Sequence, residues 1–142
     1  PYLYHSAGTK VGWGGPSTSH SAYDSMYTDE SGETLEGSKG EYVLVTKAPP
    51  VNAFWSVTVY DSTTGRLHPN DDNRYHINNT TAVNNEDGTF TFRFKVKCED
   101  GDVNCLAVPA GAFDVVARYY LPEPEIMSGK WKMPHPAKVK TD

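Results

Sequence analysis

The chain has 142 residues, which is long enough for one domain with a single hydrophobic core and too short for two domains of ordinary size. Its net charge of -5 comes from 18 acidic and 13 basic residues scattered along the chain, which argues against a nucleic-acid partner. No apolar run approaches the roughly 20 residues of a membrane-spanning helix. We therefore expect residues 1–142 to form a single domain without a membrane span. Because the first residue is Pro1 rather than Met, we also expect a fragment or subunit of a larger protein.

Residues 1–40 are rich in Gly and Ser, and this composition predicts an irregular N-terminal segment. One short helix could begin at Pro16, because Pro is favoured at the first helical position. Its apolar face would carry His20, Tyr23, Met26 and Tyr27. We expect at most this short helix in the first part of the chain.

From residue 42 onward the pattern is typical of β-strands. Four segments rich in β-branched and aromatic residues are separated by loops that contain Gly, Pro, Asn and Asp. These segments span residues 42–47, 53–61, 89–97 and 112–120. No long helical pattern is present that could connect parallel strands. The sequence therefore predicts an all-β fold, an antiparallel β-sandwich of jelly-roll type.

The segment "AFWSVTVYD" (53–61) places two sets of side chains on opposite faces of its predicted strand. The expected core face carries Trp55, Val57 and Val59. The other face carries Phe54, Ser56, Thr58 and Tyr60. This row of hydroxyl groups is either a sheet face with cross-strand Ser and Thr pairs or the floor of a polar cleft that binds a small molecule or a sugar.

The loop "HPNDDNRYHI" (68–77) brings charged residues together in the sequence. Arg74 and Tyr75 follow Asp71 and Asp72, and an Arg beside carboxylates most often forms a structural ion pair. Alternatively, Arg74 binds an anionic ligand, because its planar guanidinium group matches a carboxylate. We predict no metal site, because no recognised ligand spacing is formed by His68, Asp71, Asp72 and His76.

Two later segments show clear alternation. In 89–97 the expected core face carries Phe90, Phe92, Phe94 and Val96, and the wet face carries Thr91, Arg93, Lys95 and Lys97. In 112–120 one face carries Phe113, Val115, Ala117 and Tyr119. Arg118 lies on the opposite face between apolar neighbours, so we expect its side chain to be paired or stacked.

Cys98 and Cys105 bracket the turn-rich hexapeptide "EDGDVN". A tight loop would bring the two Cα atoms within reach of a disulfide, which we predict; the alternative is two reduced thiols at the ends of two strands. A disulfide would favour an oxidising compartment, so we expect a periplasmic or extracellular location, with the cytoplasm as the alternative. Beyond Tyr120, four prolines limit regular structure, and we expect Trp131 to dock the tail on the body.

Several phrases of the chain match a known family in the right order. They are "GWGG", "SAYDSMYTDESGETLEGSKGEYVLV", "PPVNAFWSVTVYD", "GRLHPNDDNRYHI", "NNEDGTFTF" and "CLAVPAGAFDVVARYYLPEPEIMSGKWKMP". Together they resemble the family called domain of unknown function 1214, although Cys105 stands before Leu106 where that family has Trp. The resemblance implies a β-sandwich of jelly-roll type, often following domain of unknown function 1254 in a longer and frequently exported polypeptide. It implies no activity.

We interpret the chain as a binding or structural-assembly module. Its expected partners are a carbohydrate-like or small anionic ligand, a partner subunit or further copies of the chain, without a cofactor. The candidate ligand-binding residues are Ser56, Thr58, Tyr60, Arg74, Tyr75 and Arg118. The alternative is a hydrolytic enzyme that uses Asp or His residues of the 68–76 loop. Two carboxylates facing each other across a pocket would favour the enzyme, and a shallow aromatic groove without such a pair would favour binding.

Overall fold

A computed structural model describes residues 3–4, 9–13, 20–68 and 76–139 of the protein. The strands form a seven-stranded sheet in the order β1-β2-β3-β10-β5-β6, with β7 also paired to β5, and a four-stranded sheet in the order β11-β4-β8-β9. The larger sheet contains β1 (Leu3–Tyr4), β2 (Thr9–Trp13), β3 (His20–Met26), β5 (Val51–Asp61), β6 (Arg66–Leu67), β7 (His76–Asn78) and β10 (Phe113–Pro122). The smaller sheet contains β4 (Tyr42–Thr46), β8 (Phe90–Lys95), β9 (Cys105–Ala107) and β11 (Ala137–Lys138). The described residues also form two short helices, η1 (Gly37–Lys39) and α1 (Pro124–Met127).

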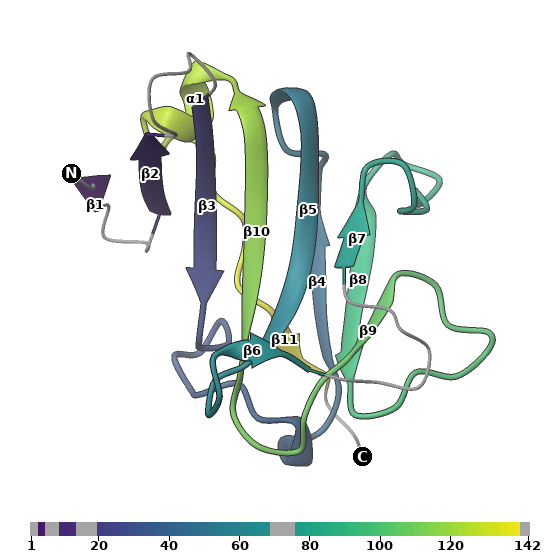
Figure 1. The fold of residues 1–142 in the computed structure, drawn as a ribbon. Helices are drawn as coiled ribbons and strands as arrows, with labels where there is room; N and C mark the ends of the chain where they lie inside the picture. Colours follow the sequence, from purple (N-terminus) through teal and green to yellow (C-terminus); the bar gives the residue numbers. More distant parts are fainter. Residues whose placement is uncertain (1–2, 5–8, 14–19, 69–75, 140–142) are drawn as a thin grey trace.

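The two sheets pack face to face. Figure 1 shows β3, β10 and β5 side by side in the larger sheet, with β4 and β8 in the layer behind them. Trp55 of β5 crosses the interface, and its ring lies edge-on to Phe90 and Phe92 of β8, with centroids 5.2 and 5.8 Å away. In the same way Tyr42 of β4 meets Phe113 of β10 edge-on at 5.6 Å. The predicted all-β sandwich is confirmed.

The largest departure from prediction lies near the N-terminus. His20–Met26 is strand β3, pairing with β10 from Ser21 to Met26, so the predicted helical face was wrong. Ala22, Asp24 and Met26 point into the core, and Ser21 and Ser25 lie on the other face. The alternation was hard to recognise because its inward positions include a small residue and an acid. Together with β1 and β2, β3 replaces part of the irregular segment that we expected.

The alternation of the later strands is confirmed, with one exception. Trp55, Val57 and Val59 are buried, and so are Phe90, Phe92 and Phe94. The prediction that Val96 lies on the core face is wrong. Val96 is 49% exposed, because β8 ends at Lys95 and the chain turns there. The structure also differs from the predicted antiparallel arrangement at β9, which runs parallel to β8 and places Cys105 opposite Arg93. The smaller sheet is therefore mixed.

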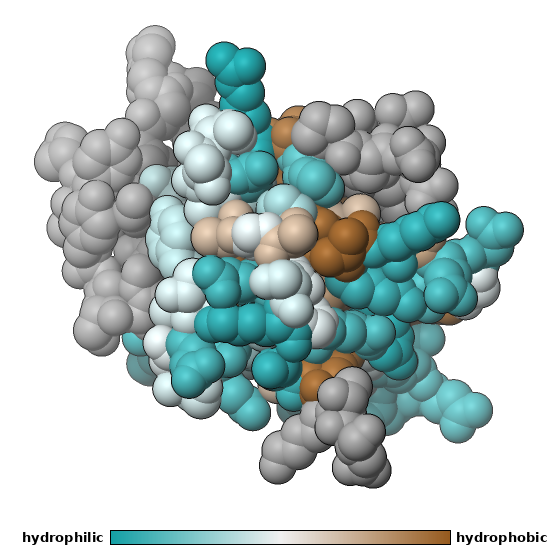
Figure 2. Space-filling model, turned by 90° about the horizontal axis from the view of Figure 1, so that it is seen from below, coloured by the Kyte–Doolittle hydropathy of each residue, from teal (hydrophilic) through white to brown (hydrophobic). Residues whose placement is uncertain are grey.

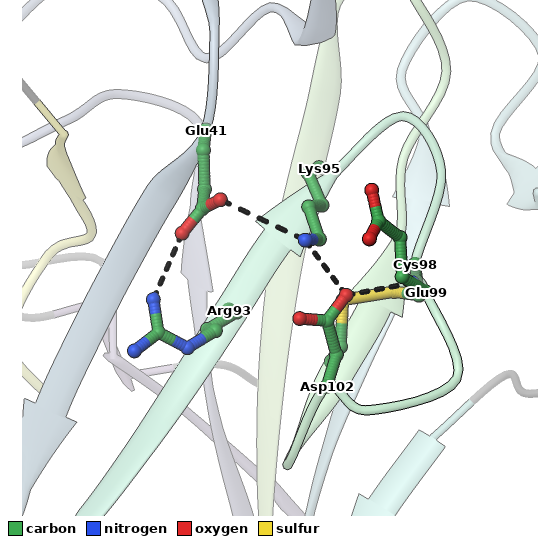
Figure 3. The surroundings of a disulfide bond; sticks show 7 residues. Glu41, Arg93, Lys95, Cys98, Glu99 and Asp102 are labelled. Atoms are coloured by element: carbon green, nitrogen blue, oxygen red, sulfur yellow. Dashed lines mark hydrogen bonds and ion pairs between the residues drawn. A yellow bond between two sulfur atoms is a disulfide. The ribbon is translucent and has the colours of Figure 1, made fainter. Parts of the chain in front are cut away.

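The disulfide between Cys98 and Cys105 closes this turn, with the two Cα atoms 6.0 Å apart (Figure 3). Inside the loop, Lys95 Nζ lies 2.7 Å from Asp102 Oδ2, and that oxygen also accepts a hydrogen bond of 2.6 Å from the Glu99 backbone N–H. The hydrogen bond with Asp102 raises the pKa of Lys95 and lowers that of Asp102. Glu41 joins Arg93 and Lys95 on the same surface. The disulfide and the ion pairs hold the loop that leads into β9, which begins at Cys105.

We expect protein purified without reductant to contain no thiol that can be alkylated. Intact mass before and after reduction and alkylation measures this directly. Because the closed loop is short, reduction should lower the free energy of unfolding by less than the roughly 3 kcal/mol expected for a 15-residue loop. The Cys98→Ser/Cys105→Ser double variant is the control, since reductant should leave its stability unchanged. Two modified cysteines in the unreduced protein would contradict the prediction.

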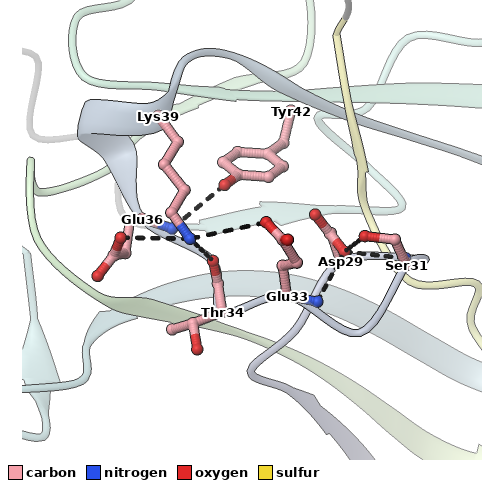
Figure 4. Close-up of polar contacts among 7 residues, drawn as sticks. All are labelled: Asp29, Ser31, Glu33, Thr34, Glu36, Lys39 and Tyr42. Carbon is pink, nitrogen blue, oxygen red and sulfur yellow. Dashed lines mark hydrogen bonds and ion pairs between the residues drawn. The ribbon is translucent and has the colours of Figure 1, made fainter.

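The loop after β3 is held by a network of polar contacts (Figure 4). The Asp29 carboxylate accepts hydrogen bonds from the Ser31 hydroxyl at 2.6 Å and from the backbone N–H of Ser31 and Glu33. These bonds, the Ser31 hydroxyl first, lower the pKa of Asp29. At η1 a Cβ on Gly37 would collide with the carbonyl oxygen of Pro109, so only glycine fits there.

Figure 2 views this end of the sandwich and shows a mostly hydrophilic surface around a small hydrophobic patch.

The C-terminal tail lies against both sheets. Trp131 meets the buried ring of Tyr119 edge-on at 5.7 Å, so the predicted docking of the tail is confirmed. Ile126 and Met133 belong to the core. β11 then pairs with the edge of β4, placing Ala137 opposite Val43. Among the described residues, no helix is long and apolar enough to span a membrane.

Candidate functional site

The surface of the larger sheet that points away from the core carries several tyrosines and hydroxyl groups. We call it the outer face. Its side chains come from four neighbouring strands and from the segments at their ends: Tyr23, Ser25, Tyr27, Phe54, Ser56, Thr58, Tyr60, Ser62, His76, Asn78, Asp114, Val116, Arg118 and Tyr120. The register of β10 with β5 puts Arg118 opposite Ser56 and Val116 opposite Thr58. On its other side, β10 places Arg118 opposite Tyr23.

Two hollows on the outer face meet at Arg118. The first, which we call the Asp114 hollow, has a volume of about 420 Å³ and is lined by Tyr23, Ser25, Tyr27, Tyr60, Ser62, Gly65, Asp114, Val116 and Arg118. The second, which we call the Thr58 hollow, has a volume of about 320 Å³ and is lined by Phe54, Ser56, Thr58, His76, Asn78, Arg118 and Tyr120. Each reaches the size of a small-molecule site.

Arg118 is held in place at the junction of the two hollows. Its guanidinium group donates a hydrogen bond of 2.9 Å to the Tyr60 hydroxyl, and its central carbon lies 5.6 Å from the centre of the Tyr60 ring. This is the paired and stacked arrangement expected from its position between apolar neighbours. Among the described residues, no carboxylate forms an ion pair with Arg118. Its positive charge therefore faces the hollows without an acidic partner from that part of the chain.

Each hollow also contains a buried polar group. Thr58 is 6% exposed, and its hydroxyl has no hydrogen-bond partner among the residues that the structure describes. Asp114 is 8% exposed, and its Oδ1 accepts a hydrogen bond of 2.9 Å from the Ser62 hydroxyl. Burial raises the pKa of Asp114; the Ser62 hydrogen bond opposes this shift and the nearby charge of Asp61 adds to it. Both groups retain hydrogen-bonding capacity that a ligand could use.

The comparisons with known proteins identify the family. A family model with the description "Protein of unknown function (DUF1214)" matches residues 20–124. The chain belongs to this family. Its DUF1214 domain is similar to the VPA0106 protein from Vibrio parahaemolyticus, with 34% identity and a TM-score of 0.80 over 84% of this chain and 31% of that one. The fold is shared with a putative uncharacterized protein from Burkholderia cenocepacia, at 12% identity and a TM-score of 0.50 over 96% of this chain and 36% of that one.

This chain therefore spans about a third of the length of each of these two proteins. None of the curated proteins compared with the DUF1214 domain matches it.

The structure of the DUF1214 domain brings together four of the six candidate ligand-binding residues. Ser56 and Thr58 line the Thr58 hollow, Tyr60 lines the Asp114 hollow, and Arg118 lines both. The other two, Arg74 and Tyr75, lie outside the described residues. Sequence reasoning missed Asp114, Tyr23, Tyr120 and Asn78 as site residues, and it considered His76 only for a metal site and for the hydrolase alternative. The alternation in 112–120 placed Asp114 and Tyr120 on the face of Arg118, but nothing in the sequence paired that strand with β3 and β5.

A third hollow lies beside the disulfide and is less suited to a ligand. It is lined by His76, Ile77, Thr81, Val83, Asp102, Val103, Asn104 and Cys105. Two of its polar side chains are engaged with the protein: Asn104 exchanges hydrogen bonds with the backbone of Val83, and Asp102 pairs with Lys95. Within the described ranges no group of three or more His, Cys, Asp or Glu residues could hold a metal ion. Of the acids in the 68–76 loop, Asp71 and Asp72 lie outside the described residues, so the hydrolase alternative stays a prediction.

Proposed function

We propose that the DUF1214 domain is a binding module whose outer face holds a small polar, carbohydrate-like ligand. The observation that carries the proposal is the pair of buried polar groups, Thr58 and Asp114, which open into adjoining hollows with hydrogen-bonding capacity to spare. Leaving a buried polar group without a partner costs about 1 to 3 kcal/mol. Hydroxyl groups of a ligand can supply the missing partner of Thr58 and can add to the Ser62 hydrogen bond that Asp114 already accepts.

The aromatic residues support the same class of ligand. Phe54 is 47% exposed, and its ring lies 4.3 Å from that of Tyr120, which gives the Thr58 hollow an apolar wall. A sugar ring presents apolar C–H faces and polar edges, so it suits a site that combines aromatic rings with hydroxyl groups. Tyr23, Tyr27 and Tyr60 provide further rings in the Asp114 hollow.

Binding is favoured over hydrolysis because of the carboxylates. Among the described residues, the two hollows contain a single acidic side chain, Asp114. Most enzymes that hydrolyse a glycosidic bond use two carboxyl groups that flank the scissile bond. In the described part of the chain, the site is thus a shallow aromatic groove with one acid. The Cys98–Cys105 disulfide supports a periplasmic or extracellular setting for this binding.

Thr58→Val is expected to weaken saccharide binding by about tenfold without lowering stability. Valine keeps the shape of the side chain, and the described residues provide no hydrogen bond to the Thr58 hydroxyl that would be lost. The matched control is Thr46→Val: Thr46 is 7% exposed, and its hydroxyl donates a hydrogen bond of 2.9 Å to the Lys47 carbonyl oxygen. That variant should lose about 1 kcal/mol of stability and bind normally.

The measurements are chemical denaturation and a titration of the protein with a saccharide panel, followed by amide chemical shifts. Shifts confined to the outer face support the proposal. A Thr58→Val variant that loses as much stability as Thr46→Val and binds like the parent would show that the hydroxyl row is only a sheet face. If no saccharide binds, a neighbouring domain or subunit is the better occupant of the outer face.

A further inference from the structure

We infer that the ligand of the outer face is an acidic saccharide whose carboxylate binds Arg118 from the Thr58 hollow. This inference rests on the proposed function and adds the charge and the orientation of the ligand. It joins three observations: a basic side chain without an acidic partner among the described residues, a hollow without an acidic lining residue in that part of the chain, and a single acid in the adjoining hollow.

The basic side chain is unusual within this protein. Three Lys and Arg residues are half-buried in the described ranges: Arg93, Lys95 and Arg118. Arg93 and Lys95 both pair with Glu41, at 2.9 and 3.9 Å, and Lys95 also pairs with Asp102 (Figure 3). Arg118 differs, since its hydrogen bond goes to the neutral hydroxyl of Tyr60. A half-buried guanidinium group is partly desolvated, so an anion that reaches it is bound more strongly than on an exposed surface.

The two hollows differ in charge, which orients the ligand. The Thr58 hollow contains the hydroxyl groups of Ser56 and Thr58 and the amide of Asn78 beside Arg118. Described acidic residues do not line it, so none of them repels an entering carboxylate at close range. The Asp114 hollow contains an acid that holds the Ser62 hydroxyl, and this acid favours neutral hydroxyl groups of a ligand over a second anion.

The chemical class follows from the combination. A small free anion would need only the two parallel N–H donors of the Arg118 guanidinium group. The Phe54–Tyr120 wall on one side and the tyrosines around Asp114 on the other provide contacts for sugar rings that flank the carboxylate. Because the hollows adjoin at Arg118, an oligosaccharide can occupy both. A uronic acid residue, which carries its carboxylate on the sugar ring, meets all of these conditions.

The test uses trimers of galacturonate, glucuronate, mannuronate and guluronate, each compared with its methyl ester, which removes the charge and keeps the sugar. Isothermal titration measures the dissociation constants. We expect one or more acids to bind at least tenfold more tightly than the matching ester, with an affinity that falls as salt rises. Arg118→Gln should weaken binding of the acid at least tenfold and weaken binding of the ester much less, because the ester accepts a hydrogen bond but carries no charge. Arg93→Gln is the matched control and should change neither.

The outcomes separate this inference from the proposed function. Equal affinity for acid and ester, unchanged in Arg118→Gln, contradicts the charge assignment and leaves saccharide binding intact. Absence of binding by every acid and every ester contradicts both. Thermal unfolding of each variant checks the fold. If Arg118→Gln does not fold, Arg118→Lys keeps the charge and loses the fork, and an acid-specific loss of affinity in that variant supports the inference.

Discussion

Phe92→Ala is expected to destabilise the protein by about 3 to 5 kcal/mol, the range for removing a fully buried aromatic ring. The side chain of Phe92 has no exposed surface. Its ring lies 5.8 Å from Trp55 of the facing sheet and 6.2 Å from Phe90 of its own strand. Alanine would leave a cavity at the contact between the two sheets, and the rigid neighbouring rings would close it only in part.

Phe54→Ala is the matched control for this prediction. Phe54 lies one residue before Trp55, but its ring is on the outer face and 47% exposed. Phe54→Ala should lower the free energy of unfolding by about 1 kcal/mol, mainly through loss of the ring contact with Tyr120. Urea denaturation of both variants and the parent gives the comparison. Equal losses for Phe92→Ala and Phe54→Ala would mean that the core does not lie between the sheets as described.

Tyr119→Phe is expected to cost about 1.5 to 3 kcal/mol at neutral pH, the range for a hydrogen bond to a charged group. The Tyr119 hydroxyl is buried and donates a hydrogen bond of 2.7 Å to Asp24 Oδ2. That oxygen also lies 3.4 Å from the backbone N–H of Met133 in the tail. The variant removes a donor from a buried carboxylate and leaves the ring contact with Trp131 in place.

The same variant should change the response to alkaline pH. Burial, and then the charge and hydrogen bond of Asp24, raise the pKa of Tyr119 well above the ordinary value of 10.0. The folded protein therefore keeps this proton at a pH where the unfolded chain releases it. The stabilising contribution is fully present below pH 10 and is lost as the pH rises beyond it. Urea denaturation from pH 8 to 11.5 should show a steeper loss of stability for the parent than for Tyr119→Phe.

Tyr120→Phe is the control, because its ring lies half-buried on the outer face and no hydrogen bond of its hydroxyl is found within the described part of the chain. It should follow the parent at every pH. Parallel pH profiles for Tyr119→Phe and the parent would contradict the assignment of the alkaline effect to this residue.

The parts of the fold that could be predicted are those with a local signal. Phe90, Phe92 and Phe94 alternate with polar residues, so the direction of β8 could be inferred without knowing its partners. The two faces of β5 followed in the same way. The disulfide was predictable because a short turn-rich segment separates the two cysteines.

The candidate site could be predicted only in part, because it depends on contacts between distant segments. Arg118 and Tyr60 are far apart in the chain and meet only through the register of β10 with β5. No periodic pattern encodes which strands become neighbours. β3 completes the Asp114 hollow, yet its inward Asp24 concealed the strand. The parallel return of β9 likewise depends on the closed loop rather than on strand propensity.

The C-terminal tail bears on how longer relatives can be divided into autonomous parts. The family model ends at residue 124, at the start of α1, whereas the segment beyond it supplies Ile126 and Met133 to the interior. That segment also bridges the layers, since Pro136 accepts a hydrogen bond from Glu30 and Val139 donates one to Glu41. β11 shields the free edge of β4, which would otherwise be open to pairing with another chain. The segment that the family model matches is therefore shorter than the segment that folds together. A truncation after residue 124 is expected to expose part of the core and the edge of β4, and to give an aggregation-prone fragment.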